Sequence, residues 1–176
     1  MPPDNKKNGE LKTIIGDNAI IRSHTVIYAG NIIGKYFKTG HHVMIREENN
    51  IGNNVSIGTN SVIEHHIIIN DNARTHAGCF IPEYSIIEDS AWLGPNVVLT
   101  NARYPRSKNV KENLKGVILK RHAKIGANTT ILPSIEIGEN SLIGAGSLVT
   151  KNIPANSVAY GNPAVVKKNL IDLGEY

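Results

Sequence analysis

The most constraining feature of this sequence is an aliphatic residue at every sixth position. The repeat runs from position 15 to position 99, with threonine at the two exceptions, Thr39 and Thr75. It breaks once and resumes from position 119 to position 149. A six-residue unit cannot bury its own apolar side chain, whereas stacked units bury theirs along one continuous core. The sequence therefore predicts an all-β solenoid.

Each six-residue unit is long enough for a short strand followed by a corner. Glycine follows the aliphatic residue in many units, as at Gly16 and Gly58. Asparagine recurs two residues later, as at Asn18 and Asn60. Glycine and asparagine are the residues that most readily adopt a positive φ. The pattern therefore predicts tight turns between the strands.

The repeat also divides the chain into segments. A polar segment, 1–14, is expected to be flexible, and the solenoid covers 15–154. A polar loop at 100–118 interrupts the repeat, and insertions in a solenoid gather on one face, which is often the functional one. A tail at 155–176 completes the chain. It includes a short cap, Ala164–Tyr176, for which a helix is one possible conformation.

Composition excludes several classes of protein. The single cysteine, Cys79, cannot form an internal disulfide, which fits a reducing compartment and a cytoplasmic location, and its small inward-turning position predicts a packed thiol. No apolar run approaches 18 residues, so no membrane insertion is expected. The formal net charge of +4, without a basic stripe interleaved with aromatic residues, does not indicate nucleic-acid binding. It is compatible with a small polyphosphate ligand.

The six-residue pattern resembles that of the hexapeptide-repeat proteins. This resemblance implies a left-handed parallel β-helix, in which three hexapeptides form one triangular coil, so that the chain would make about seven coils of about 18 residues. The left hand comes from the resemblance alone, because generic crossover rules favour the right hand. It also implies a homotrimer with active sites between subunits.

The C-terminal repeats more specifically resemble those of the acetyl-CoA-dependent hexapeptide acyltransferases. The matching motifs are IGAGSLVTK at Ile143–Lys151, IP at Ile153–Pro154 and GNPA at Gly161–Ala164. The resemblance implies acetyl-CoA as co-substrate. The family's CoA contacts correspond to Ala127, Ala145, Thr150, Lys151 and Lys168.

The segment that ends at Arg106 resembles the nucleotide-sugar N-acetyltransferases. Galactoside O-acetyltransferases carry a catalytic His–Pro pair in their loop, and this chain has Tyr104–Pro105 instead. The resemblance implies transfer to an amino group on a nucleotide-linked deoxy sugar. An amine with a pKa near 8 is partly neutral at pH 7 and needs no strong base. The matching residues are Glu88, Asp89, Gly94, Pro95, Thr100, Asn101, Pro105 and Arg106.

Three of these residues are predicted to contact the acceptor. Arg106 would pair with the diphosphate of the nucleotide sugar, and Asn101 would hold the amine or a sugar hydroxyl. Glu88 is placed beside the same nucleotide sugar. The alternative for Arg106 is a surface residue that fixes the loop.

Coil arithmetic adds a column of polar residues. With 18 residues per coil, Glu47, His65, Glu83 and Asn101 fall at one corner, about 5 Å apart, where the loop leaves. We predict His65, Glu83 and Asn101 as catalytic residues, with His65 as a base or substrate contact oriented by Glu83. The alternative is an exposed polar ladder without a role.

Three other functions remain open. The chain could transfer an acyl group to a hydroxyl, with His65 or His76 as the base. The γ-type carbonic anhydrases have the same fold and bind zinc through histidines, but their ligand pair is five residues apart and no two histidines here have that spacing. No metal site is therefore predicted. A non-catalytic scaffold is the third possibility.

Overall fold

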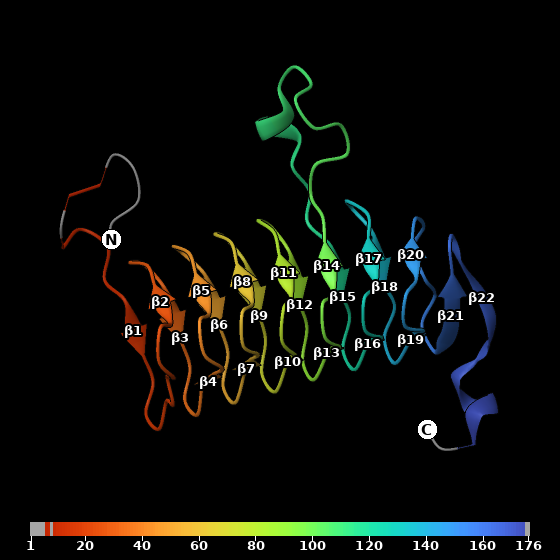
Figure 1. Ribbon diagram of the computed structural model, residues 1–176, viewed down its shortest axis with the longest axis horizontal. Helices are drawn as coiled ribbons and strands as arrows, with labels where there is room; N and C mark the ends of the chain where they lie inside the picture. Colours follow the sequence, from red (N-terminus) through yellow and green to blue (C-terminus); the bar gives the residue numbers. More distant parts are fainter. Residues whose placement is uncertain (1–5, 8, 175–176) are drawn as a thin grey trace.

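The computed structural model describes residues 6–7 and 9–174, and it shows a left-handed parallel β-helix of about eight turns (Figure 1). Part of the predicted flexible segment (1–5 and 8) and the end of the predicted cap (175–176) lie outside the described residues. Most coils repeat after 18 residues, as in the pairing of Ile14 with Ile32, whereas the last coil pairs Leu142 with Val158 after 16. The predicted fold is therefore confirmed, with about eight turns where about seven were predicted.

Short strands stack into three sheets, which we name sheet A, sheet B and sheet C. Sheet A contains β1 (Ile14–Ile15), β3 (Ile32–Ile33), β6 (Asn50–Ile51), β9 (Ile68–Ile69), β12 (Ile86–Ile87), β15 (Ile118–Leu119) and β18 (Glu136–Ile137). Sheet B contains β4 (Lys38–Thr39), β7 (Ser56–Ile57), β10 (Arg74–Thr75), β13 (Trp92–Leu93), β16 (Lys124–Ile125), β19 (Leu142–Ile143), β21 (Ser157–Gly161) and β22 (Ala164–Asn169). Sheet C contains β2 (Val26–Ile27), β5 (Met44–Ile45), β8 (Val62–Ile63), β11 (Phe80–Ile81), β14 (Val98–Leu99), β17 (Thr130–Ile131) and β20 (Leu148–Val149).

The second residue of each two-residue strand points inward and forms the core. Between β3 and β20 all of these residues are buried, including Ile45, Ile63 and Ile81, each 0% exposed. The two threonines that interrupt the pattern are buried as well. The Thr39 hydroxyl accepts a hydrogen bond from the Arg22 amide at 3.0 Å, and the Thr75 hydroxyl accepts one from the Gly58 amide at 3.2 Å. Both exceptions are thus compatible with burial because their hydroxyls are paired.

The corners confirm the prediction for asparagine and correct it for glycine. Corner asparagines adopt a left-handed conformation, with φ of 63° at Asn18 and 58° at Asn60. The glycines that follow the aliphatic residue do not have positive φ. At Gly58 an added Cβ would lie 2.3 Å from the backbone carbon of His76 in the next coil, and at Gly126 it would lie 2.4 Å from the Ala145 amide nitrogen. These glycines permit close stacking of the coils.

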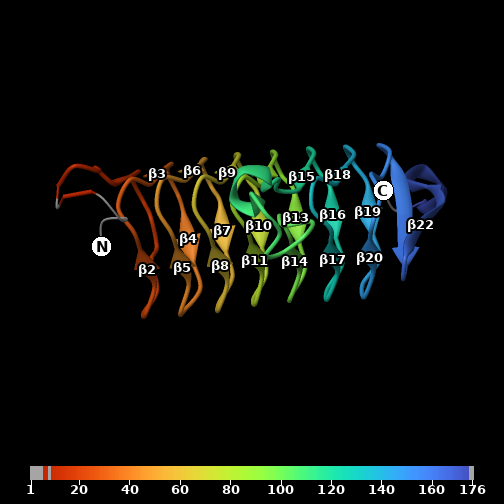
Figure 2. The ribbon, with the colours of Figure 1, turned by 90° about the horizontal axis from the view of Figure 1, so that it is seen from above.

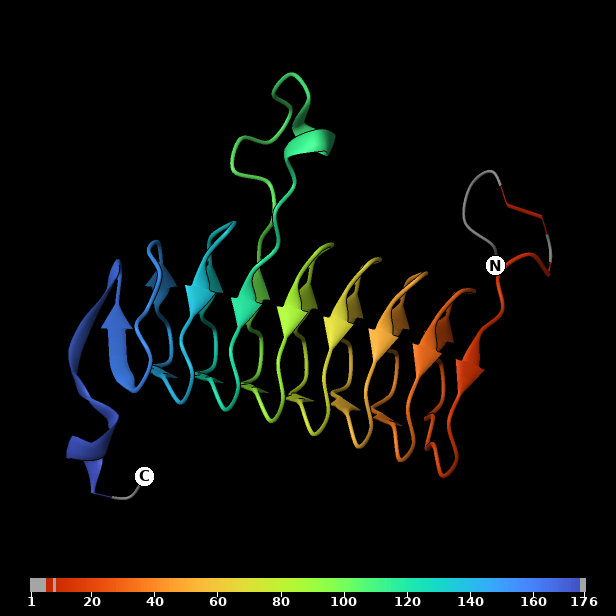
Figure 3. The ribbon, with the colours of Figure 1, turned by 180° about the vertical axis from the view of Figure 1, so that it is seen from behind.

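The polar insertion forms one protruding loop. Paired residues of sheet A are 18 apart in sequence until Ile86 pairs with Ile118, which is 32 residues away. The loop leaves after β14, contains the short 3-10 helix η1 (Val110–Asn113), and stands clear of the coils (Figures 1 and 3). A hydrogen bond joins the two ends of the loop, because the Lys115 amide donates to the Asn101 carbonyl at 3.0 Å. The repeat then resumes in register.

The C-terminal cap is a hairpin and not mainly a helix. Ala164–Asn169 forms β22, which pairs antiparallel with β21 at the end of sheet B (Figure 2). Only Leu170–Leu173 is helical, as the 3-10 helix η2. Leu170 is buried, and its amide donates to the Asn156 carbonyl at 2.7 Å. A strand satisfies the exposed backbone of the last coil, which a helix would leave unpaired.

Two composition-based expectations can be compared with the structure. Cys79 is 1% exposed, its thiol donates to the Gly94 carbonyl at 3.2 Å, and burial raises the pKa of the thiol, as expected for a packed cysteine. Within residues 6–7 and 9–174 there is no helix of the length and apolar character that crossing a bilayer requires.

Removal of one core side chain should destabilise the whole coil stack. Ile51 in β6 is 1% exposed, whereas its neighbour Asn50 is exposed. We expect Ile51→Ala to lower the free energy of unfolding by about 2–5 kcal/mol, because it leaves a cavity in the core. Asn50→Ala is the matched control and should change it by about 0.5 kcal/mol or less. Equal losses in denaturant unfolding of the two variants would contradict this account of the core.

Candidate active site

The candidate site lies at the corner between sheet C and sheet A, where the loop leaves the coils. Three of the four residues of the predicted column are joined there by side-chain contacts. The Asn101 amide nitrogen donates to one Glu83 carboxylate oxygen at 2.5 Å, and His65 Nε2 lies 3.5 Å from the other. Glu83 therefore links the two predicted partners, and Asn101 keeps its own side-chain oxygen available to accept a hydrogen bond.

A second histidine, which the sequence reasoning did not select, completes this cluster. His66 Nδ1 lies 2.7 Å from His65 Nδ1, so one ring donates and the other accepts. His66 Nε2 lies 3.4 Å from Glu48. Both nitrogens of His65 are therefore engaged, one by His66 and one by Glu83. In this arrangement each ring nitrogen of His65 faces a polar partner, whichever of the two carries the proton.

Glu47 departs from the predicted ladder because it turns toward its own neighbour. The Arg46 guanidinium donates to both Glu47 carboxylate oxygens, at 2.7 and 3.0 Å, and it also contacts Glu64 at 3.2 Å. Burial alone would raise the pKa of Glu47, but the hydrogen bonds and charge of Arg46 outweigh it, so the pKa is lowered. Because Glu47 pairs with Arg46, the contacts of the His65 ring in this cluster are those with Glu83 and His66.

A pocket of about 240 Å³ lies at the base of the loop, on the other side of Asn101. It is lined by Thr100, Ala102, Arg103, Leu132, Pro133, Ile135 and Thr150. Thr100 directly precedes Asn101, and Thr150 is a predicted CoA contact, so the pocket adjoins both predicted sites. Arg103 is its only charged lining residue. The sequence alone did not single out Arg103 as a lining residue of a pocket, because it is one of several basic residues in the loop.

The predicted substrate contacts are not gathered within one chain. Glu88 lies at the corner between sheet A and sheet B, away from Asn101. Its carboxylate accepts from Lys120 Nζ at 3.0 Å and from the Arg121 amide at 3.1 Å. The hydrogen bond to Glu88 raises the pKa of Lys120. Arg106 is exposed on the loop with φ of 63°.

The predicted CoA contacts border the last coils. Ala127 and Ala145 occupy equivalent corners of successive coils, where the Gly146 amide donates to the Ala127 carbonyl at 2.8 Å. Thr150 and Lys151 follow β20, which separates them from Ala145. Lys168 is exposed on β22, and β22 contacts β20. Ala127 and Ala145 therefore lie at the corner between sheets B and C, whereas Thr150 and Lys151 lie on the side of β20 that leads to sheet A.

Three of the remaining histidines pack against other aromatic rings. Among the described residues no group of three or more His, Cys, Asp or Glu side chains has the arrangement that a metal ion requires. His24 and His42 stack on each other with ring centroids 4.5 Å apart. His76 packs against Trp92 with centroids 4.9 Å apart, and it comes from sheet B, outside the cluster around Glu83.

Comparison with known proteins identifies the repeat. The family described as bacterial transferase hexapeptide (six repeats) matches residues 50–83 and 116–151. The galactoside O-acetyltransferase of Lactococcus lactis subsp. lactis (strain IL1403) is 43% identical over 83 residues, which are 45% of this chain and 40% of that protein. The dTDP-3-amino-3,6-dideoxy-alpha-D-galactopyranose 3-N-acetyltransferase of Aneurinibacillus thermoaerophilus is 48% identical over 56 residues, which are 32% of this chain and 29% of that protein.

The solved structures agree with the fold. A serine acetyltransferase in complex with CoA superposes with a TM-score of 0.50 and 26% identity, over 58% of this chain and 40% of that one. The six-residue repeat, the β-helix and these partial matches make the chain similar to the hexapeptide-repeat transferases. The chain spans less than half the length of the curated relatives described above.

The Glu47–Arg46 pair should make stability depend on pH. A carboxylate with a lowered pKa in the folded state stabilises the protein above its unfolded pKa of about 4.3. This contribution is lost as the pH falls through the folded pKa. We expect the wild type to exceed Glu47→Gln in free energy of unfolding at pH 6–7, and this difference should shrink below about pH 4. A constant difference from pH 7 to pH 3 in denaturant titrations would refute the assignment.

Proposed function

We propose that the protein is an acetyl-CoA-dependent N-acetyltransferase that acts on an amino group of a nucleotide-linked deoxy sugar. The observation that carries the choice of an amine is the engagement of both His65 nitrogens, by His66 and by Glu83. A hydroxyl acceptor requires a base with a free lone pair, whereas a sugar amine is already partly neutral at pH 7. The loop supports the same choice, since it carries Tyr104–Pro105 and no histidine.

The proposed reaction assigns a role to each group of the corner. The amine attacks the thioester carbonyl, the carbon–sulfur bond breaks, and the leaving thiolate takes up the proton that the amine loses. Asn101 accepts a hydrogen bond from the amine through its side-chain oxygen, while Glu83 fixes its amide group at 2.5 Å. His65 positions Glu83. Arg106 and Glu88 are proposed to contact the nucleotide sugar from the loop and from the neighbouring corner.

The co-substrate is proposed to lie along the C-terminal coils. Ala127 and Ala145 leave space for the pantetheine arm, and Thr150 borders the pocket at the loop base. Lys151 and Lys168 are placed to meet the phosphates of CoA. Similarity to a serine acetyltransferase whose structure contains CoA supports an acyl-CoA co-substrate.

Association of copies is proposed to complete the site. The outer column of sheet A is largely isoleucine, with Ile32 53% exposed, and that of sheet C is also apolar, with Val26 53% exposed. Exposed apolar columns of this kind are typical of interaction surfaces. A homotrimer that covers them would bring residues of one copy, such as Glu88, near the loop of another.

O-acetylation is the second candidate, because the relative from Lactococcus lactis is named a galactoside O-acetyltransferase. In that case His65 would have to leave His66 to act as a base. A thiol-release assay with acetyl-CoA separates the two. We expect release with nucleotide-linked amino sugars at pH 7 to 8 and none with the matched hydroxyl sugars. Release with hydroxyl acceptors alone would overturn the N-acetyltransferase proposal.

Substitutions at the corner should have unequal effects. We expect Asn101→Ala to lower kcat/KM for the amino sugar by about 10- to 100-fold, because the amine loses its hydrogen-bond acceptor. His65→Gln should lower it by less than about 10-fold, whereas loss of a general base costs about 10²- to 10⁴-fold. Asn53→Ala, at an exposed corner outside the outer columns of sheets A and C, is the control for Asn101→Ala. A loss of 10³-fold in His65→Gln would show that His65 is itself the base.

A further inference from the structure

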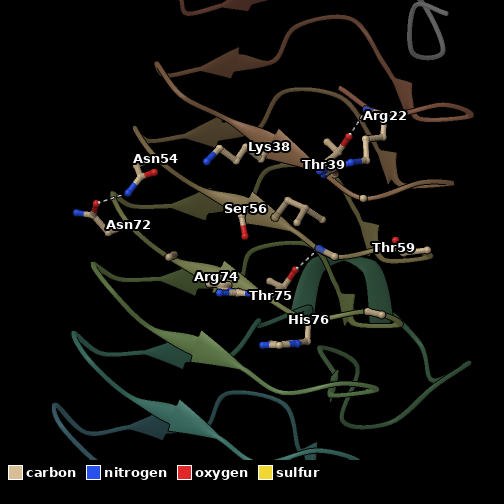
Figure 4. A pocket seen from close by; sticks show the side chains of 15 residues that line it. Arg22, Lys38, Thr39, Asn54, Ser56, Thr59, Asn72, Arg74, Thr75 and His76 are labelled. Carbon is tan, nitrogen blue, oxygen red and sulfur yellow. Dashed lines mark hydrogen bonds between the residues drawn. The ribbon is translucent and has the colours of Figure 1, made fainter. Parts of the chain in front are cut away.

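A hollow of about 520 Å³ lies on the outer face of sheet B, in the N-terminal coils and away from the loop (Figure 4). Its centre is Ser56 in β7, which pairs with Lys38 of β4 on one side and with Arg74 of β10 on the other. Beside Ser56 the surface is formed by Gly40 and Gly58. A short side chain and two bare backbone positions between long basic side chains account for the hollow.

The hollow is cationic. Arg22, Lys38, Arg74 and His76 line it, and no aspartate or glutamate is among its described lining residues. The Arg22 guanidinium donates to the Thr39 carbonyl at 2.8 Å, which holds it at one edge (Figure 4). Within residues 6–7 and 9–174, Lys38 and Arg74 form no ion pair. Their charges are therefore available to an anion from outside the chain.

Among the described residues, the border of the hollow supplies no ion-pair partner to Lys38 or Arg74. Asn54 Nδ2 donates to Asn72 at 3.0 Å, and this pair closes the side next to sheet A (Figure 4). Asp71, which precedes Asn72, accepts a hydrogen bond from the Asn53 amide at 2.7 Å. That carboxylate is thus engaged at the corner and is absent from the lining of the hollow.

His76 also lines this hollow, so its ring can be used as a probe of binding there. Its ring packs edge-on against Trp92, with centroids 4.9 Å apart. Burial, with a smaller contribution from the charge of Arg74, lowers the pKa of His76. An anion bound beside Arg74 would offset that positive charge and favour the protonated ring.

We propose that this hollow binds a phosphate or diphosphate group, held between Lys38 and Arg74 over the Ser56 hydroxyl. Lys38 and Arg74 start from strands two sheet spacings apart, about 10 Å, and both have long flexible stems that can converge above Ser56. The guanidinium fork matches two phosphate oxygens, and the ammonium and the hydroxyl supply further donors. This site is distinct from the corner that contains Asn101, and its existence does not depend on the proposed function.

Calorimetric titration with pyrophosphate tests the site directly. We expect Lys38→Gln and Arg74→Gln each to weaken binding by at least about 10-fold, because each removes a charge-assisted hydrogen bond. Lys35→Gln is the matched control, since Lys35 lies in the same coil but faces Asp17 at 3.5 Å. It removes the same charge and should leave the affinity unchanged. No binding of pyrophosphate to the wild type, or equal weakening by Lys35→Gln, would overturn the proposal.

A spectroscopic measurement keeps the test independent of folding defects. We expect pyrophosphate to raise the pKa of the His76 ring in NMR titrations of the wild type, and Lys38→Gln to require at least about 10-fold more pyrophosphate for the same change. An unchanged His76 pKa in the wild type at saturating pyrophosphate would contradict binding at this hollow.

A kinetic comparison distinguishes two possible sources of the phosphate, the acceptor itself and a separate phosphorylated ligand. This comparison rests on the proposed function. If the diphosphate of the acceptor occupies the hollow, Lys38→Gln should raise KM for the nucleotide-linked amino sugar and not for the amino sugar alone. If a separate phosphorylated ligand occupies it, both KM values should stay unchanged while pyrophosphate binding is still weakened. Failure of acetyl transfer itself would leave the calorimetric result intact.

Discussion

The stacking of one coil on the next, in an 18-residue register, is the constraint on which the rest of the structure depends. Each coil donates backbone hydrogen bonds to its neighbour, as from Gly34 to the Ile51 carbonyl at 2.8 Å and from Gly52 to the Ile69 carbonyl at 2.7 Å. Inward aliphatic side chains then pile up in continuous columns. Because strand pairing stays in phase through the loop insertion and the shorter last coil, outward side chains also fall into columns. The chemistry of the protein is therefore arranged by column and corner.

This arrangement separates three surfaces with different properties. The outer columns of sheets A and C are largely apolar, whereas that of sheet B carries Lys38 and Arg74 around the hollow. The loop can leave at the corner between sheets C and A because β15 resumes pairing with β12 without a change of register. Polar contacts between coils, such as that from Asn101 to Glu83, then hold the functional side chains in place.

Most of the fold could be predicted from the sequence, because a six-residue period is a local signal that repeats many times. The inward positions, the insertion and the left-handed asparagines all follow from it. The glycines were misread, because their role at Gly58 concerns the backbone of the next coil and not their own φ. The conformation of Ala164–Asn169 was left open, because it depends on pairing with β21, a contact that the repeat does not describe.

The sequence alone determined which residues share a corner, including His65, Glu83 and Asn101, since the period fixes the column of each residue. Only the tertiary structure decided what these side chains do with one another. It turned Glu47 toward Arg46, and it joined His65 to His66. It also set the hollow on sheet B apart from the loop corner. The physical reason is that a repeat specifies backbone register, whereas hydrogen bonds and charges between side chains depend on rotamers and on neighbours from other coils.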